Sequence, residues 1–311
     1  MIDLAFLLRR GRFVGVGLLV FTLVLTGCDA FTDQDLGDSN PQPPTIAEYI
    51  QEVRVFSSLE AAVAEADLTS TLNDESSTIT VFAPTDDAFS PPIDPSLNQQ
   101  VLTKVLQHHT VNGEVTSGDL NDGDKETPLA GDNLAIEVSD GVISTVNRAS
   151  VTNADAEASN GVVHVVDNLL IDAVDRATLT PRFTIFARLV KEAGLESALR
   201  GAGANDGRTI FAPTNEALLT ALDDNGNGSI ESSEIPSGAA DILRHHVHDN
   251  ALLAGDIPSD TTVSSLEGTD LTLSGGDAVS VKPGAENASV TVPDVVVDNG
   301  VIHGIDTVLQ P

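Results

Sequence analysis

The segment from Asp223 to Glu234, DDNGNGSIESSE, carries oxygen-bearing side chains at a spacing that could hold a cation. Its residues fit the calcium-loop pattern D-x-[DN]-x-[DN]-G-x5-E at every required position. Gly228 permits the sharp turn of such a loop, and Ile230 fills the apolar position between ligands. The oxygen ligands would be Asp223, Asn225, Asn227, the Ser229 carbonyl, Glu231 (directly or through water) and Glu234 as a bidentate carboxylate.

This segment resembles a single EF-hand loop, and it follows an apolar pattern, NEALLTAL, that predicts an entering helix. Two of its ligands are neutral Asn side chains, so we expect it to bind one Ca²⁺ with modest affinity. The sequence contains no second loop of this pattern, which favours a structural ion over a regulatory switch. The alternative is an acidic, solvated loop built of turn residues.

Two pairs of adjacent histidines give a weaker signal for a metal site. His108 precedes His109, and His245 precedes His246. Neighbouring residues on a helix point to different faces, so we expect at most one of each pair to face inward. The pairs therefore do not indicate a transition-metal site.

Two further histidines lie on apolar runs near the end of each half of the chain. His164 and His303 are surrounded by Val and Ile, which favours buried, hydrogen-bonded core groups over ligands. Asp167 and Asp306 follow them and are expected to fix local turns rather than to form catalytic dyads. The sequence has no G-x-S-x-G, paired cysteines, H-E-x-x-H or phosphate-binding glycine loop, so we expect no enzyme activity.

The amino-terminal segment has the pattern of an export signal. Three arginines precede the apolar run FVGVGLLVFTLVLTGC, which is typical of a secretory signal and shorter than the about 20 apolar residues of a membrane span. The ending Leu-Thr-Gly-Cys resembles a bacterial lipoprotein site, so residues 1–27 are predicted to be removed and Cys28, the sole cysteine, to carry lipid. Residues 28–44 are polar and predict a disordered tether. A plain signal or an uncleaved anchor is the alternative.

The charge of the chain excludes two classes of partner. The chain has 15 Lys+Arg against 47 Asp+Glu, a net charge of −32. Nucleic acids and anionic lipid surfaces are bound through basic patches, so neither partner is expected through charge. Aromatic residues make up only 4% of the chain, which leaves few platforms for stacking bases or sugars.

Four blocks of sequence occur twice in the same order. A repeat with a period as long as a whole domain indicates a tandem duplication. We predict a first domain at 45–172, a linker at 173–177 and a second domain at 178–311. The calcium-type loop, 223–234, accounts for a longer middle segment in the second domain. The blocks are TVFAPTDDAF and TIFAPTNEAL, AEADLTSTL and KEAGLESAL, VLQHHTV and ILRHHVH, and NGVVHVVDNLL and NGVIHGIDTVL.

Periodicity assigns the same order of elements to both domains. Apolar residues at helical spacing come first, and short alternating runs with Asp-Gly and Asn-Gly turns come last, which predicts an α+β fold. The repeated decapeptide predicts a strand that ends at a proline, followed by a helix capped by Thr or the next Asx residue. The structural residues expected at this corner are Phe82, Pro84 and Thr85 in the first domain and Phe211, Pro213 and Thr214 in the second.

Taken together, the boxes T-x-F-A-P-T-Asx-x-A and N-G-V-x-H-x-x-D-x-x-L, with His109 or His246 between them, resemble a fasciclin-type domain in both halves. The resemblance implies a compact β-wedge sandwich with packed helices. It also implies extracellular adhesion by binding proteins or matrix polysaccharides, without catalysis. The family usually has Tyr-His where this chain has His-His, so no ligand role of that tyrosine carries over.

These expectations combine into a lipid-anchored, exported adhesion or matrix-association protein of a bacterium. Its partners would be extracellular proteins or polysaccharides, and it would meet the membrane through its amino-terminal lipid. One alternative is a periplasmic scaffolding lipoprotein without an external ligand. A hydrolase with a site that the motifs do not reveal is a third hypothesis.

Overall fold

A computed structural model describes residues 42–201, 207–275, 279–282 and 287–311 of the chain. The signal and Cys28 lie outside the described residues, as does the predicted tether up to residue 41. Residues 42–311 form one compact unit that contains both repeats. Within the described residues, no helix is long and apolar enough to cross a membrane.

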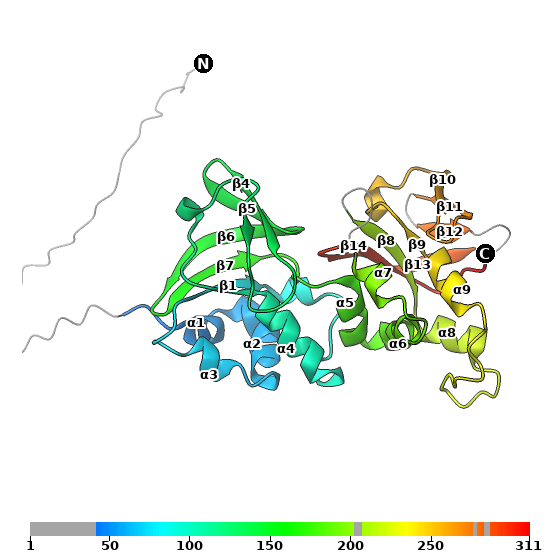
Figure 1. Ribbon diagram of the computed structural model, residues 1–311, viewed down its shortest axis with the longest axis horizontal. Coiled ribbons are helices and arrows are strands. Elements are labelled where there is room, and N and C mark those ends of the chain that lie inside the picture. Colours follow the sequence, from blue (N-terminus) through cyan, green and yellow to red (C-terminus); the bar gives the residue numbers. More distant parts are fainter. Residues whose placement is uncertain (1–41, 202–206, 276–278, 283–286) are drawn as a thin grey trace, which may run out of the picture. The chain divides into compact units, whose positions relative to one another are not determined.

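The first repeat packs short helices against a seven-stranded sheet (Figure 1) with the order β2-β1-β7-β6-β5-β4-β3. All neighbouring strands are antiparallel except β1 and β7, which run parallel. The helices are α1 (Ile46–Glu52), η1 (Arg54–Phe56), α2 (Ser57–Glu65), α3 (Thr69–Leu72), η2 (Asp86–Phe89), η3 (Pro95–Leu97), α4 (Gln99–His108) and η4 (Ser117–Asp119). The strands are β1 (Ile79–Pro84), β2 (Thr110–Asn112), β3 (Lys125–Glu126), β4 (Leu134–Ser139), β5 (Val142–Val146), β6 (Ala149–Ala158) and β7 (Gly161–Val166).

The second repeat follows the same plan, with a seven-stranded sheet in the order β10-β11-β12-β13-β14-β8-β9. Its parallel pair is β8 with β14. The helices are α5 (Ala173–Leu179), η5 (Pro181–Phe183), α6 (Thr184–Glu192), α7 (Glu196–Arg200), α8 (Asn215–Leu222), α9 (Ala239–His245) and η6 (Ala254–Asp256). The strands are β8 (Arg208–Pro213), β9 (Val247–His248), β10 (Thr261–Ser264), β11 (Asp270–Ser274), β12 (Ser280–Lys282), β13 (Ala288–Val297) and β14 (Gly300–Ile305). The predicted α+β class is confirmed.

The buried apolar side chains of the described residues form three clusters, and one of them crosses the junction between the repeats. Phe82 centres a cluster within the first sheet, and Phe211 centres its equivalent in the second. A larger cluster extends through the helices of both repeats, from Ile46 in α1 through α5 to Leu243 in α9. The two repeats therefore bury their helical layers against each other as well as against their own sheets.

The repeated decapeptide forms a strand that ends at its proline, as predicted, but its polar residues act differently. Thr214 caps α8, and its hydroxyl accepts a hydrogen bond from the Ala217 N–H at 3.3 Å. Thr85 precedes a short 3₁₀ helix and makes no side-chain cap bond, so the expected cap is absent there. The next residue instead caps the preceding helix. Asp86 accepts from the Ser58 N–H at 2.7 Å, and Asn215 accepts from the Ile185 N–H at 3.0 Å.

The predicted linker, 173–177, is wrong in its secondary structure, because these residues form most of α5. This helix is the second repeat's equivalent of α1, and one asparagine holds each of the two helices in the same way. Asn160 Oδ1 accepts from the first N–H of α1, Ile46, and Asn299 Oδ1 accepts from the first N–H of α5, Ala173, both at 2.9 Å. The N-cap of α5 is Asp172, so this helix spans the predicted linker and continues to Leu179.

Candidate functional site

The predicted calcium loop follows α8 and folds back on itself through its own polar groups. The Asp223 carboxylate accepts hydrogen bonds at 2.8–3.1 Å from three backbone N–H groups between residues 226 and 228. At the other end, the Glu234 carboxylate accepts from the Glu231 N–H at 2.9 Å. The carboxylates that begin and end the pattern therefore both turn toward the loop interior.

The two Asn side chains lie between these carboxylates. Asn225 Nδ2 donates to Glu231 Oε2 at 3.1 Å and to Glu234 Oε1 at 2.9 Å, and Asn227 Nδ2 donates to Glu231 Oε1 at 2.7 Å. The Ser229 N–H donates to Asn227 Oδ1 at 2.8 Å. These amide N–H groups stabilise the carboxylates by hydrogen bonding.

The side chains of the loop offer the oxygen ligands that Ca²⁺ needs only when the amide groups of Asn225 and Asn227 rotate. Rotating a terminal Asn amide exchanges Nδ2 for Oδ1 with little change of shape, and that exchange would present oxygen to an ion. No group of three His, Cys, Asp or Glu side chains is placed to hold a metal ion in the described part of the chain. A cation in this loop would therefore depend on Asn225 and Asn227 as well as on the carboxylates.

The middle of the loop is tied to the core of the second repeat. Ile230 is 2% exposed and belongs to the helical apolar cluster. Its carbonyl oxygen accepts a hydrogen bond from Arg188 Nη2 on α6 at 2.8 Å. The middle of the loop is therefore fixed to α6 and to the core of the second repeat.

The second histidine of each adjacent pair is a structural core group. His109 Nδ1 lies 2.8 Å from the Val105 carbonyl and donates to it, while its Nε2 accepts from the Leu170 N–H at 2.9 Å. His246 repeats this arrangement with the Ile242 carbonyl and the Leu309 N–H. This geometry requires the neutral ring, and burial lowers the pKa of both histidines to about 4.

His164 on β7 and His303 on β14 lie where the pairing with the neighbouring strand, β6 or β13, is irregular. His164 Nδ1 accepts from the Asp155 N–H at 3.2 Å, and its Nε2 donates to the Val115 carbonyl at 2.9 Å. His303 does the same with the Asp294 N–H and the Leu252 carbonyl. Burial is the main cause that lowers the pKa of both rings. Each ring also stacks on the core phenylalanine of the adjacent parallel strand.

The aspartates that follow these histidines lie at turns, where each accepts a backbone hydrogen bond. Asp167 accepts from the Ser150 N–H at 2.7 Å and Asp306 accepts from the Ser289 N–H at 2.8 Å. Neither aspartate is hydrogen-bonded to a histidine ring in the described residues. These hydrogen bonds hold the end of β7 to β6 and the end of β14 to β13.

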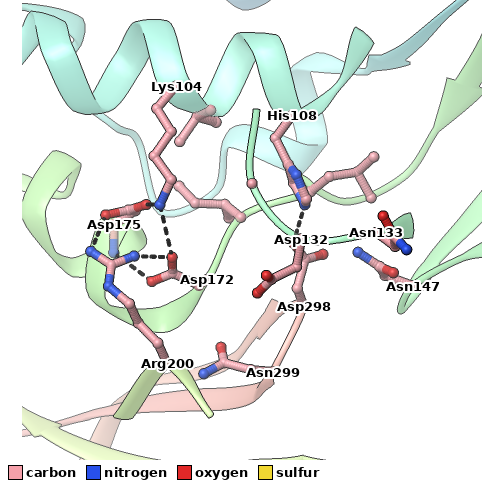
Figure 2. Close-up of a pocket in the computed structure, with 14 residues that line it drawn as sticks. Lys104, His108, Asp132, Asn133, Asn147, Asp172, Asp175, Arg200, Asp298 and Asn299 are labelled. Atoms are coloured by element: carbon pink, nitrogen blue, oxygen red, sulfur yellow. Dashed lines mark hydrogen bonds and ion pairs between the residues drawn. The ribbon is translucent and has the colours of Figure 1, made fainter. Parts of the chain in front are cut away.

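A polar cavity of about 360 Å³ lies at the junction of the repeats, where the sequence motifs pointed to no site. Figure 2 shows charged side chains from α4, α5 and α7, together with the turn before β14, meeting around it. Lys104 Nζ lies 2.8 Å from Asp175 and 3.6 Å from Asp172, and Arg200 pairs with both aspartates. The cations of this cluster are thus already neutralised by neighbouring carboxylates.

Asp175 is the most strongly held carboxylate of this cluster. Burial alone would raise its pKa, but hydrogen bonds from Arg200 and Lys104 outweigh burial and lower the pKa to about 2. The carboxylate therefore stays ionised, and it links α4 of the first repeat to α5 and α7 of the second.

His108 closes another side of this cavity, contrary to the expectation that only one of each histidine pair is buried. His108 is 8% exposed and His109 is 1% exposed. The two rings do point to different faces of α4. His109 faces its own core, whereas His108 Nε2 lies 3.0 Å from Asp298 Oδ2 in the second repeat (Figure 2). The equivalent His245 is also buried, at 1% exposed, so the contact with Asp298, rather than burial itself, is what the neighbouring repeat adds at His108.

Comparison with known proteins gives a family match to both repeats. The family model described as the fasciclin domain matches residues 54–172 and 181–311. Both matches begin just after the first helix of a repeat, since α1 ends at Glu52 and α5 ends at Leu179. The family model therefore covers the sheets and most of the helices of both repeats.

Two curated relatives and one solved structure show how far the similarity extends. Protein sll1483 of Synechocystis is 40% identical over 134 residues, covering 41% of this chain and 73% of the relative. The transforming growth factor-beta-induced protein ig-h3 of Sus scrofa is 30% identical over 251 residues, covering 75% of this chain but 34% of the relative. A FAS1 domain pair from the insect cell adhesion molecule Fasciclin I matches 86% of this chain and 97% of its own, with 16% identity and a TM-score of 0.39.

Proposed function

Because the chain belongs to the fasciclin-domain family, we propose that it is an exported adhesion or matrix-association protein that binds extracellular proteins or polysaccharides. The observation that carries the proposal is the presence of two fasciclin units in one chain, each with its own sheet and helices. A net charge of −32 favours neutral or basic partners over anionic ones. A non-enzymatic role is part of the proposal.

The location of the protein tests this proposal against a scaffold that faces only the periplasm. Whole cells would be treated with protease without lysis, and the protein would be followed with an antibody to residues 42–311. An adhesion protein should be cleaved on intact cells, while a periplasmic marker protein remains whole. Full protection of the chain on intact cells would support the scaffolding role instead.

We further propose that lipid on Cys28 anchors the protein to the membrane. The proposal rests on the Leu-Thr-Gly-Cys box and on the absence of any other cysteine from the sequence. Several acyl chains anchor stably where one chain gives only marginal binding.

Replacing this residue, Cys28→Ser, should move the protein from the membrane fraction to the soluble fraction, because the acyl chains supply the apolar contact with the bilayer. Fractionation followed by immunoblotting would measure the shift. Ser39→Ala, a similar small change in the predicted tether, should leave the protein in the membrane fraction. Retention of the Cys28→Ser variant in the membrane would mean that the apolar leader itself is the anchor.

We also propose that the loop 223–234 binds one Ca²⁺ and stabilises the second domain. Support comes from the inward carboxylates of Asp223 and Glu234 and from the burial of Ile230 within the loop. The ion would supply a charge that holds three carboxylates of one loop together, in a chain that is already strongly acidic. Turning of the two Asn amides would accompany binding.

Calcium should raise the melting temperature of the second domain and leave the first nearly unchanged. Binding to the folded state alone stabilises it by about 2.7 kcal/mol at a hundredfold excess of free ion over Kd. Glu234→Gln should remove most of this response, because it replaces the bidentate charged ligand. Calorimetric melts of residues 42–311 with and without Ca²⁺ would measure both effects.

The matched control for this substitution is Glu216→Gln. Glu216 is an exposed residue in the first turn of α8 and lies outside the loop, so it changes the net charge equally without removing a ligand. This control should keep the full calcium response. A calcium response that survives Glu234→Gln would place the ion elsewhere. If the unaltered chain shows no response to Ca²⁺, the loop 223–234 is a polar insertion that binds no ion.

A further inference from the structure

Hydrogen-bond geometry assigns a protonation state to most of the histidines of this chain. A neutral imidazole has one N–H donor and one acceptor nitrogen, whereas the imidazolium ion has two donors. His109, His164, His246 and His303 each face one carbonyl acceptor and one backbone N–H donor, which fits a neutral ring. These four rings lie inside their own repeats.

His108 differs, because both of its ring nitrogens face acceptors. Nδ1 lies 2.9 Å from the Ala130 carbonyl oxygen, and Nε2 lies 3.0 Å from Asp298 Oδ2. A neutral ring could donate to only one of these oxygens and would turn a lone pair toward the other. Only the imidazolium ion satisfies both, and one of the two acceptors belongs to the other repeat.

The ring is held in this place by close packing as well as by its hydrogen bonds. Gly131 lies against it, where a Cβ would come within 2.5 Å of His108 Nδ1. With a φ of +88°, Gly131 also has a backbone conformation that favours glycine. The loop 130–131 of the first repeat therefore packs closely against the ring on the side of Nδ1.

The equivalent histidine of the second repeat lacks the partner that the neighbouring repeat supplies. His245 Nδ1 bonds to the Thr269 hydroxyl at 2.6 Å, and its buried Nε2 has no hydrogen-bond partner. Glu267 lies further away, 3.9 Å from Nδ1. Burial is the main cause that lowers the pKa of His245. The doubly bonded arrangement of His108 is therefore a property of the junction and not of the fold of one repeat.

Several other charged groups face His108 across the cavity. Lys104 lies one turn before His108 on α4, and Asp132 follows the loop 130–131 that packs against the ring. From the second repeat come Asp298, at the turn before β14, and the cluster of Asp172, Asp175 and Arg200. In that cluster, Arg200 and Lys104 offset the two aspartates, which leaves Asp298 as the carboxylate that a proton on His108 neutralises.

We propose that His108 is a pH-operated latch between the two fasciclin domains. As the imidazolium ion it joins the Ala130 loop to Asp298 and holds that edge of the cavity closed. When the proton leaves, the ring can donate to only one of the two oxygens, and the bridge between the Ala130 loop and Asp298 at this edge of the cavity is broken. The latch would let a change of pH alter how far the cavity between the domains is exposed.

The direction of the pH effect follows from the balance of interactions at His108. Burial by itself would lower the pKa of this ring, but the hydrogen bond and charge of Asp298, with the Ala130 carbonyl, outweigh burial and raise it. The latch is then fully formed below the ordinary pKa of 6.5 and is lost as the pH rises through the higher pKa of the folded state.

Nuclear magnetic resonance of ¹⁵N-labelled histidines in residues 42–311 tests the protonation states. At about pH 6, both ring nitrogens of His108 should carry protons, while His109, His164, His246 and His303 carry one each. Asp298→Asn should lower the pKa of His108, so that the ring loses a proton at this pH. A singly protonated His108 in the unaltered chain at about pH 6 would overturn the proposal.

Distance measurements between the domains test the opening itself. Residues 42–311 contain no cysteine, so Glu75→Cys and Ser259→Cys can carry a pair of spin labels, one in each repeat. The distance distribution should be narrow at about pH 6 and broader at about pH 9. His108→Gln should show the broad distribution at both values, because its amide cannot be protonated.

His248→Gln is the control for this measurement. His248 bonds to the Ser264 carbonyl within the second repeat, so its replacement should keep the pH response of the unaltered chain. Distributions that are the same at both pH values in the labelled chain with His108 present would contradict the latch, as would a pH response that survives His108→Gln.

Discussion

A fragment that begins at residue 178 should fail to fold cooperatively, whereas one that begins at residue 171 should fold. The five residues in question, 173–177, form most of α5, and each is at most 4% exposed. Removing them would leave Asn299 Oδ1 without the Ala173 N–H and would uncover the apolar cluster that α5 covers. Burying one Val side chain is worth about 1.5–3 kcal/mol, and a whole domain is stable by only about 5–15 kcal/mol.

Thermal melts followed by circular dichroism would compare the fragments 171–311 and 178–311. The matched pair in the first repeat is 44–172 and 51–172, because α1 holds the position of α5 there and its first N–H bonds to Asn160. Both shortened fragments should lose their sharp transition. A cooperative melt of 178–311 at the temperature of 171–311 would show that α5 does not belong to the second domain.

The second large effect is a loss of stability in acid that comes from the core histidines. Burial lowers the pKa of His109 and His246 from 6.5 to about 4, so the unfolded chain binds these protons first as the pH falls. The stability that these two rings contribute is therefore fully present above pH 6.5 and is lost as the pH falls toward 4. Each ring accounts for about 3 kcal/mol over this range, on a scale of about 1.4 kcal/mol per unit of pKa.

Urea unfolding of residues 42–311 between these pH values would measure the effect, in about 0.5 M NaCl to screen repulsion among the acidic side chains. His109→Gln should weaken the pH dependence of the first domain only, because an amide can donate to the Val105 carbonyl and accept from the Leu170 N–H without titrating. Part of the dependence should remain, because burial also lowers the pKa of His164 in this domain. The second domain, with His246 intact, is the internal control. Unchanged stability between pH 6.5 and pH 4 would mean that these rings do not stay neutral in the folded state.

Features that a short stretch of sequence determines by itself could be predicted. Periodicity predicted the α+β class, and the duplicated boxes predicted the family. The parallel pairing of β1 with β7 was not predicted, because these strands lie about 80 residues apart in the sequence. The core character of His164 and His303 followed from their apolar neighbours. The loop from Asp223 to Glu234 could be located because its pattern is contained in twelve consecutive positions.

What could not be predicted depends on contacts between residues far apart in the sequence. The segment 173–177 contains Asp and Arg, which favours an exposed linker, yet Asp175 and Arg176 are buried and contact groups of the first repeat. The cavity at the junction needs α4 of one repeat and the turn before β14 of the other. Aligning the repeats before placing the boundary would have found α5, because it lies at the position of α1.

A binding array of matrix glycans and matrix proteins would show whether this chain binds an extracellular protein or polysaccharide. Residues 42–311 would be applied with Ca²⁺ present, beside the Glu234→Gln variant and an unrelated protein of similar negative charge. The account predicts saturable binding to a small set of neutral glycans or basic proteins, and none to sulfated polysaccharides, which a chain of net charge −32 should repel. Binding no stronger than that of the acidic control protein across the whole array would contradict the account.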